Sequence, residues 1–600
     1  MTGARPRVLV TGLGCLVFAA AVVAFWPGVS GDFLNWDDRD NVVNNPGVHG
    51  LGRAQLQWMW SGVVLGHYIP LTWMSFGLNY VLGGLNPWGY HVLNLGLHGA
   101  NAVLFYLIAR RLLARARPGG AEPGTWALSL GAAFSALVFA VHPLRVESVV
   151  WITERKDVLC GLFFLGSVLA YLKAVRGDAL DRRWQVVSLA SFAAALLAKA
   201  AAMPLPAILL LLDAYPLGRA RGAAGWRRVL VEKIPWAILG TAGALMALRA
   251  VYTGTAVTGY ARYGPGARLA MTVYTFVFYP ARWFWPVELL PLYELPSEVR
   301  LLAPRFLLPA LAFVGVTAAL AALRRRWPAG LAAWSASILI LLPISGAVHS
   351  GHQLAHDRYS YLSGLGLALL FGGGLTWLLS AQALGKVSAV IARSVTAGAV
   401  LVVLVLAAGA WDQSKVWHNS ETLWRWTTGI DSQCAICWNN LGTSLTDQKR
   451  HAEAETAYRR ALELRPNRAS VVNNVATALY GQRKYAEAEE MLKVALKLDP
   501  GLTGALMNMG ALKALEGRYA EALPYFRPAY ARDPKFAELA KNFALALTFE
   551  ATEQKKAGRR LEAMALYQEA LTVIPGDVEA RRQLDALSAE SAGSGSPAGR

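Results

Sequence analysis

Charged residues are scarce in this 600-residue chain: Asp, Glu, Lys and Arg make up 16% of it, whereas hydrophobic residues make up 55%. Soluble globular proteins have a charged fraction of about a quarter. The deficit excludes an ordinary soluble chain and indicates a polytopic membrane protein that carries a soluble part. The formal net charge is +19, but the cations stand in short clusters between apolar runs. We therefore expect no nucleic-acid partner.

Cysteines and the common catalytic motifs are lacking as well. The four cysteines, Cys15, Cys160, Cys434 and Cys437, do not suit a disulfide framework or a four-cysteine zinc site. The sequence has no Walker loop, no His-Glu-x-x-His, no Gly-x-Ser-x-Gly and no dinucleotide fingerprint. For Cys434 and Cys437 we predict a structural disulfide or two buried thiols.

Long apolar runs are abundant instead. About eleven have the length of a membrane span: 8–28, 89–109, 126–142, 157–175, 184–201, 203–218, 234–253, 303–323, 329–348, 359–380 and 394–411. A further aromatic and proline-broken stretch, 269–293, is interpreted as an interfacial or re-entrant element. This interpretation keeps Arg324, Arg325 and Arg326 on the same side as the other cationic loops.

Cationic clusters predict the orientation of these spans. If Arg5 and Arg7 are cytoplasmic, the inside loops receive the basic residues of 110–117, 173–183 and 219–233. All residues after Trp411 then lie outside the cytoplasm. The first run has no small-x-small cleavage site at its end, so we expect a retained span rather than a signal peptide.

A repeat of 34 residues begins near residue 436. The spacing is typical of tetratricopeptide repeats, each made of two helices. We predict about four repeats over 436–587, a connector at 412–435 and a disordered tail at 588–600, with about seven extra residues, or two helical turns, in the fourth repeat. The marker residues are Asn440, Asn474, Asn508 and Asn542, then Ala454, Ala488 and Ala522, then Pro466, Pro500 and Pro534.

Adjacent carboxylates, Asp37 and Asp38, stand near the start of the first outside loop, 29–88. Two interpretations remain open. The pair either begins a solvated acidic loop or helix cap, or supplies a base at the membrane surface, where burial and a second carboxylate raise one pKa.

Two later outside loops are also rich in polar groups. The first, 142–157, holds seven ionisable or imidazole groups, which is costly at a membrane boundary unless they pair with one another or bind a ligand. The second contains His349, His352 and His356, which could ligate a metal. Loop histidines near lipid headgroups are commoner than metal sites, so we predict none. Arg358 with two neighbouring tyrosines suits a phosphate better.

Together the three loops place carboxylates, cations and aromatic rings at one membrane face, above apolar walls. Cations suit a phosphate, aromatic faces suit a sugar, and a lateral apolar slot suits a lipid tail. The residues therefore favour a protein that uses a lipid-linked phosphosugar.

Several ordered motifs carry a family resemblance. They are Asn35-Trp36-Asp37-Asp38, His91-Val92-Leu93-Asn94, His142-Pro143-x-x-x-Glu147-Ser148, Glu154-Arg155-Lys156-Asp157, Leu211 to Leu217, Tyr279 to Tyr293 and Asp357-Arg358-Tyr359-Ser360-Tyr361. In this order, and followed by the repeats, they resemble the transmembrane-and-tetratricopeptide O-mannosyltransferase family of the GT-C class. One departure is Ile69-Pro70, where relatives often have Arg-Pro.

The resemblance implies an all-α GT-C-like membrane domain at 1–411 and an extracytoplasmic tetratricopeptide solenoid. It implies inverting transfer of a sugar from a polyprenyl-phosphate carrier to an acceptor hydroxyl, with Asp37 or Asp38 as the base. Asp37 is favoured because Trp36 shields it. The implied donor-binding residues are Glu154, Arg155, Lys156, Arg358, Tyr359, Tyr361, His142, Glu147 and His91, and the implied acceptor-binding residues are Asn440, Asn474 and Asn508.

Richness in Ala, Gly, Arg and Leu favours a bacterial inner-membrane protein with an undecaprenyl carrier. The expected partners are a lipid-linked sugar, a protein or peptide acceptor on the repeats, and the bilayer, with no resident cofactor. Two alternatives stay open, a non-catalytic scaffold for envelope assembly and a transporter of lipid-linked sugars. A scaffold should tolerate changes at Asp37 and Asp38, and a transporter should carry ionisable groups at mid-membrane depth.

Overall fold

The computed structural model describes residues 4–116, 125–254, 263–345 and 353–594, and the chain divides into two compact units, Met1–Ile430 and Asp431–Arg600. His349 and His352, two of the three histidines considered as metal ligands, lie outside the described residues, as does the end of the predicted tail.

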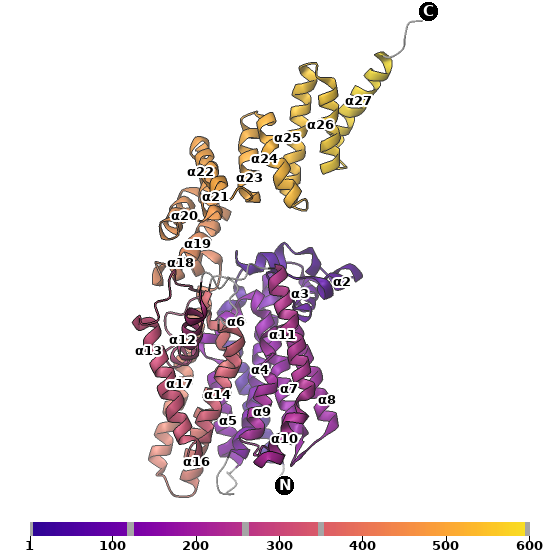
Figure 1. Cartoon of the computed structure of the whole chain (residues 1–600). Coiled ribbons are helices and arrows are strands. Elements are labelled where there is room, and N and C mark those ends of the chain that lie inside the picture. The colour runs from indigo at the N-terminus through magenta and orange to yellow at the C-terminus, as the bar shows by residue number, and fades with distance from the viewer. Residues whose placement is uncertain (1–3, 117–124, 255–262, 346–352, 595–600) are drawn as a thin grey trace, which may run out of the picture. The chain divides into compact units, whose positions relative to one another are not determined.

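Long helices form the first unit (Figure 1). They are α1 Ala4–Phe25, α2 Arg53–Ser61, α3 Pro70–Gly83, α4 Pro87–Arg115, α5 Thr125–Ala140, α6 Val146–Val150, α7 Arg155–Ala174, α8 Arg182–Ala198, α9 Leu205–Ala214, α10 Gly222–Glu232, α11 Ile234–Gly254, α12 Pro265–Phe284, α13 Pro304–Ala322, α14 Pro328–Leu341, α15 Ser360–Ser363, α16 Leu365–Ala383, α17 Ala389–Val416 and α18 Ser420–Ile430.

Each predicted apolar run overlaps one of these helices, but fewer than eleven of the described helices are long and apolar enough to cross a membrane. Among the described residues, seven helices are long and apolar enough to cross a membrane, and a bent pair, Trp126–Ala140 with Pro143–Val150, makes an eighth. Two further apolar segments, Ala200–Ala214 and Pro328–Ile344, are too short, and a proline in each, Pro204 and Pro343, separates a short 3-10 turn from the α-helix or lies within that turn. The 20-residue α12 is not among the seven helices.

The bend between α5 and α6 has a local cause. Pro143 cannot continue α5, and the His142 imidazole accepts a hydrogen bond from the Leu144 N–H at 3.2 Å, which caps a short helix, Pro143–Arg145. The chain turns by 57° at this point. As a result, Arg145 and Glu147 lie on the inner side of the bundle, where both are buried.

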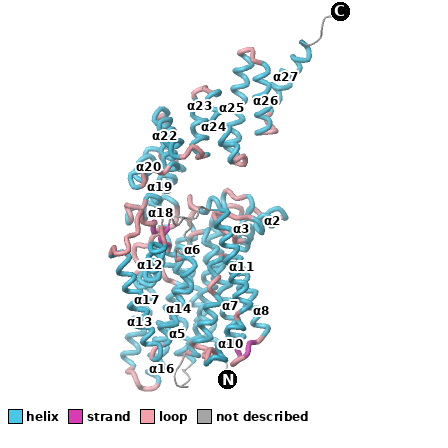
Figure 2. The backbone as a smooth tube through the Cα atoms, in the orientation of Figure 1, coloured by secondary structure: helices cyan, strands magenta, loops and turns pink. Residues whose placement is uncertain are grey.

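Two small two-stranded sheets lie at opposite ends of the bundle (Figure 2). The first is a hairpin in which strand β1 Val175–Arg176 pairs with β2 Ala179–Leu180 through a turn at Gly177, whose φ of +60° favours glycine. In the second, strand β3 Tyr293–Glu294 pairs with β4 Gln353–Ala355, which follows it only after two long helices. This second sheet fixes the chain just before Asp357 and Arg358.

Helical hairpins form the second unit, as the 34-residue period predicts. The helices are α19 Ala435–Asp447, α20 His451–Leu464, α21 Ala469–Gly481, α22 Tyr485–Leu498, α23 Thr503–Leu515, α24 Tyr519–Arg532, α25 Ala537–Lys556, α26 Arg560–Val573 and α27 Val578–Ser594. The extra residues of the fourth repeat extend α25 to 20 residues, whereas α21 and α23 have 13.

Alanines fill the contacts between these helices, since Ala454, Ala488 and Ala522 are fully buried. Cys434 and Cys437 form a disulfide at the start of α19, as one of the two predicted alternatives required. The predicted tail begins too early, because α27 continues to Ser594.

Candidate functional site

The two acidic residues of the first loop have different surroundings. Asp38 is fully buried. Its carboxylate accepts hydrogen bonds from the Leu34 N–H at 2.9 Å, the Thr153 N–H at 2.9 Å and the Thr153 hydroxyl at 2.5 Å. Burial raises the pKa of Asp38 to about 6, against these hydrogen bonds, which lower it. Asp38 therefore ties the first loop to the second.

Asp37 is half-buried, and its carboxylate has no hydrogen bond or ion pair to any residue that the structure describes. Only its backbone carbonyl is engaged, by the Asn41 amide at 3.0 Å. Burial raises the pKa of Asp37, while the charges of Lys156 and Arg358 oppose the increase. Asp37 is thus a carboxylate with free lone pairs and a raised proton affinity.

Aromatic rings surround this position. Trp36 stacks on Trp151 with ring centroids 4.5 Å apart and meets Trp424 edge-on at 5.1 Å. The Trp424 indole donates to the Asn35 side chain at 2.9 Å, which fixes the loop against α18. The buried Trp151 indole N–H has no hydrogen-bond partner among the described residues. Trp151 is fully buried, so the half-buried Trp36 is the ring of this pair that a sugar could contact.

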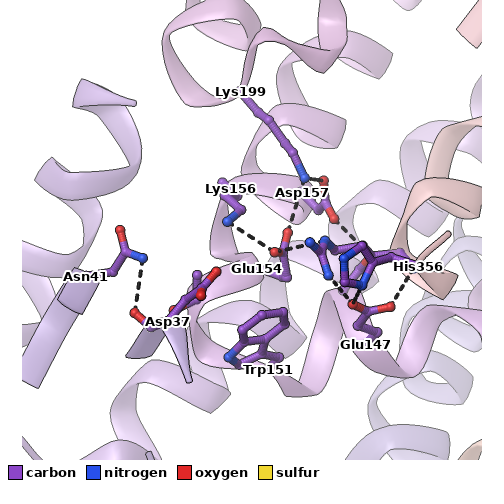
Figure 3. A network of polar contacts seen from close by, with 12 residues as sticks. Asp37, Asn41, Glu147, Trp151, Glu154, Lys156, Asp157, Lys199 and His356 are labelled. Atoms are coloured by element: carbon purple, nitrogen blue, oxygen red, sulfur yellow. Dashed lines mark hydrogen bonds and ion pairs between the residues drawn. The ribbon is translucent and has the colours of Figure 1, made fainter. Parts of the chain in front are cut away.

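A buried ionic network lies beside Asp37 (Figure 3). Its centre is Glu154, which is fully buried and meets Lys156 at 3.1 Å, Lys199 at 3.2 Å and the Arg358 Nε at 3.1 Å. Lys199 also pairs with Asp157 at 2.6 Å.

Arg358 links this network to Glu147. Its guanidinium and its backbone N–H both donate to the Glu147 carboxylate, the second at 2.8 Å. His356 Nδ1 lies 2.6 Å from the Pro291 carbonyl and 3.4 Å from Glu147, so this nitrogen carries a proton. Burial and the Arg358 charge lower the pKa of His356, which keeps the ring neutral. Three carboxylates thus balance three cations: Glu147, Glu154 and Asp157 against Lys156, Lys199 and Arg358.

A pocket of about 400 Å³ of atom-free space, part of it open to solvent, borders the network. Both polar and aliphatic side chains line it. This combination suits a charged head with an apolar tail. The lining residues are Asp157, Cys160, Lys199, Ala201, Ile340, Ile344, Arg358, Tyr359, Tyr361 and Leu362.

Other residues that were expected to bind the sugar donor instead connect helices and loops of the fold. Arg155 points away from the network and donates to the Asn79 side chain at 3.0 Å and the Tyr90 carbonyl at 2.7 Å, which joins α3, α4 and α7. His91 meets the Gly31 carbonyl at 3.1 Å, and His142 meets the Trp283 carbonyl at 2.9 Å.

Tyr361 both joins parts of the fold and lines the pocket. Its hydroxyl donates or accepts within a buried cluster with His98 and Asn101, each at 2.9 Å. Its ring lines the pocket.

Two residues near the network were missed from the sequence. Lys199 stands alone at the end of an apolar run, and an isolated ionisable residue at a span end is the signal that points to it. His67 follows a tight turn with left-handed residues Leu65, φ +49°, and Gly66, φ +73°. Burial and the charges of Lys156 and Lys199 lower the pKa of His67 to about 3, so it is a neutral ring facing the cations.

In the repeats, the expected acceptor residues form a ladder. The Asn474 amide donates to Asn439 at 3.0 Å, and the Asn508 amide donates to Asn473 at 2.9 Å. Asn440 accepts from Asn439 at 3.3 Å. These side chains are half-buried. They join successive repeats, and part of each side chain remains open to solvent.

A second buried ionic cluster lies at the β1–β2 end of the first unit. Asp213, fully buried, accepts from Tyr171 at 2.7 Å, Arg219 at 2.9 Å and Lys233 at 2.5 Å. Arg219 also meets Glu232 at 2.8 Å and the Gly177 carbonyl at 3.2 Å. Because its charges are paired, we interpret this cluster as a structural anchor.

Curated relatives match most of the chain. It is 25% identical to human protein O-mannosyl-transferase TMTC1 over 521 residues, which are 76% of this chain and 56% of that protein. It is 23% identical to mouse protein O-mannosyl-transferase TMTC3 over 499 residues, 75% and 51% of the two chains. A family model for tetratricopeptide repeats matches residues 429–500. The resemblance predicted from the motifs and the repeats is confirmed.

A shorter match is closer in sequence: human protein O-mannosyl-transferase TMTC4 is 34% identical over 203 residues, 31% of this chain and 27% of that protein. The chain thus spans about half the length of these relatives or less. Among solved structures, the tetratricopeptide protein YrrB matches 27% of this chain and 80% of its own, at 20% identity and a TM-score of 0.23. MamA matches 26% and 80%, at 17% identity and a TM-score of 0.22.

Proposed function

We propose that the chain is an integral-membrane glycosyltransferase that moves a sugar, mannose by analogy with its relatives, from a polyprenyl-phosphate carrier to a hydroxyl group of a protein acceptor. The observation that carries this proposal is Asp37. It is the unpaired carboxylate beside a network in which the charges of Glu147, Glu154 and Asp157 are already balanced. A base has to keep its lone pairs free, and a structural carboxylate does not.

In the proposed reaction, the Asp37 carboxylate takes the proton of the acceptor hydroxyl. The hydroxyl oxygen forms a bond to the anomeric carbon while the bond from that carbon to the phosphate oxygen breaks. The polyprenyl phosphate leaves with the electron pair, from the face opposite the attack, so the anomeric centre inverts. Lys156 and Arg358, the cations whose charges act on Asp37, stabilise the developing phosphate charge.

The surroundings support a lipid-linked donor. The half-buried Trp36, held in place by stacking on Trp151, offers an aromatic ring for the sugar. Ile340, Ile344 and Leu362 give the pocket an aliphatic side for the first isoprene units. The ionisable groups of this site belong to loops and helix ends at one end of the bundle, which favours surface transfer over a transport pathway.

The repeats complete the proposal. Their half-open Asn440, Asn474 and Asn508 side chains would bind the backbone of an extended acceptor segment. With the cationic loops in the cytoplasm, the repeats and the catalytic loops would both lie in the periplasm of a bacterium.

The purified full-length chain in detergent tests this function. It is supplied with undecaprenyl-phosphate mannose and peptides rich in Ser and Thr. Mass spectrometry should detect added hexose on peptide hydroxyls, and none with the Asp37→Asn variant. A chain that binds peptides but transfers nothing from several lipid-linked sugars, and whose deletion leaves the exported glycoproteome unchanged, is a scaffold.

A further inference from the structure

Arg145 is a buried cation without a matching anion among the residues that the structure describes. It is fully buried, and its one recorded hydrogen bond goes from Nη1 to the Ser360 hydroxyl at 3.0 Å. Its Nε and Nη2 groups are buried with no partner in the described part of the chain. Asp357 is the carboxyl group that acts on it electrostatically, and burial raises the pKa of Asp357 well above its usual value, which weakens it as a counter-ion.

Arg155 shows that a buried arginine in this fold can have hydrogen-bond partners for its whole guanidinium. It is equally buried, yet Asn79, Asn94, Ser75 and the Tyr90 carbonyl accept its hydrogen bonds. The fold therefore satisfies one guanidinium with neutral acceptors and leaves the other with two free donor nitrogens. A buried guanidinium in this condition is destabilising unless an anion binds to it.

A glycine allows the Arg145 guanidinium to lie directly against the backbone at residue 364. A Cβ atom at Gly364 would lie 2.7 Å from Arg145 Nη2 and 3.1 Å from the Trp283 ring. Gly364 and Ser360 both line a second pocket, whose other walls are mostly apolar. Its remaining lining residues are Tyr279, Pro280, Trp283, Ser337, Leu341, Ser363 and Leu367.

We infer that Arg145 and Ser360, beside the pocket at Gly364, bind the phosphate group of an isoprenoid lipid, at a position additional to the one beside Lys156 and Arg358 that the phosphate takes during transfer. A planar guanidinium suits phosphate oxygens, and two free N–H groups can bind them together. Pro280, Leu341 and Leu367 give the isoprenoid chain an apolar wall. The Tyr361 ring lies 5.8 Å from the Arg145 guanidinium carbon and also lines the pocket of the ionic network, so the two pockets are neighbours. The inference rests on the proposed function only in naming this lipid as the sugar carrier.

Thermal unfolding of the full-length chain in detergent tests binding without any transfer step. Farnesyl phosphate should raise the Tm of the wild type in proportion to its concentration. Farnesol, inorganic phosphate and phosphatidylglycerol are the controls. They should give at most a small shift, because each lacks either the phosphate or the isoprenoid chain.

Three variants separate binding from folding. Arg145→Gln should keep or raise the Tm without ligand, because it removes an uncompensated charge, and should weaken farnesyl phosphate binding about 10- to 100-fold. Gly364→Ala should weaken binding because its Cβ atom meets Arg145 Nη2 and displaces the guanidinium without removing its charge. Arg155→Gln is the matched control: it should lower the Tm without ligand but keep the shift that farnesyl phosphate produces.

An unchanged farnesyl phosphate shift in both Arg145→Gln and Gly364→Ala would overturn the inference. So would equal shifts with inorganic phosphate or phosphatidylglycerol, which would mark a free-anion or headgroup site. If Arg145→Gln does not fold, Gly364→Ala decides. A chain that loses the shift in these variants but transfers no sugar would refute the proposed function and keep this inference.

Discussion

The strongest prediction concerns the unequal roles of Asp37 and Asp38. Asp37→Asn removes a proton acceptor at nearly constant volume, and loss of a general base costs about 10²–10⁴-fold in rate. The change should leave the Tm almost unaltered, because the Asp37 carboxylate makes no hydrogen bond to a described residue.

Asp38→Asn should behave in the opposite way. One oxygen of Asp38 serves two donors of Thr153, and the other serves the Leu34 N–H. An amide has one oxygen, so its NH₂ group must face a donor and leave at least one buried N–H unpaired. That costs about 1–3 kcal/mol. The Tm should fall, and the rate should fall less than in Asp37→Asn.

The assay is single-turnover transfer from a lipid-linked sugar by purified wild type and variants, with the Tm of each sample measured in parallel. Asp38→Ser, which cannot replace the second carboxylate oxygen, serves as a further control. A rate loss of about 100-fold in Asp38→Asn at unchanged Tm, with Asp37→Asn active, would make Asp38 the base. Full activity in both variants would refute the mechanism.

Three further predictions follow from the same contacts. Burial raises the pKa of Asp38 from 3.8 to about 6, which corresponds to a preference of about 3 kcal/mol for the protonated form. The stability that this protonation contributes is fully present below about pH 4 and is lost as the pH rises through 6. The Tm of the wild type should therefore fall over this range, and a Tm that falls equally in Asp38→Asn would contradict this. Lys199→Gln should destabilise the first unit by about 3–5 kcal/mol, because Glu154 and Asp157 lose a buried cation; denaturant unfolding measures this, and a change below about 1 kcal/mol would refute it. In the repeats, Asn474→Ala removes the donor and Asn439→Ala removes the acceptor of the same hydrogen bond, so each should lower the stability by about 1 kcal/mol. Only Asn474→Ala should weaken the binding of an acceptor peptide. Equal weakening in both variants would show that the asparagine ladder has only a structural role.

Local patterns predicted the repeats, the apolar helices and the three polar loops, because each is set by residues close in sequence. They did not separate the roles of residues within a loop. Arg155 and Lys156 are adjacent, but only Lys156 faces the network, because successive residues of a helix start point about 100° apart. Sequence also did not connect Glu147 with Arg358, 211 positions away. Lys199 and His67 were not predicted as site residues, because no neighbouring motif marks them.

The balanced network has a mechanistic consequence. In the proposed step Asp37 loses its negative charge on taking the proton, while the phosphate gains one as it leaves, so the total charge of the site does not change. The Lys156 and Arg358 charges that act on Asp37 are then free to act on the phosphate. Stabilisation that moves from base to leaving group is realised in the transition state, where it raises kcat, and not in the bound substrate. Asp37→Asn removes the negative charge beforehand, so it should bind the donor at least as tightly as the wild type while kcat falls. A donor Kd that rises in step with the loss of kcat would show that Asp37 positions the donor and is not the base.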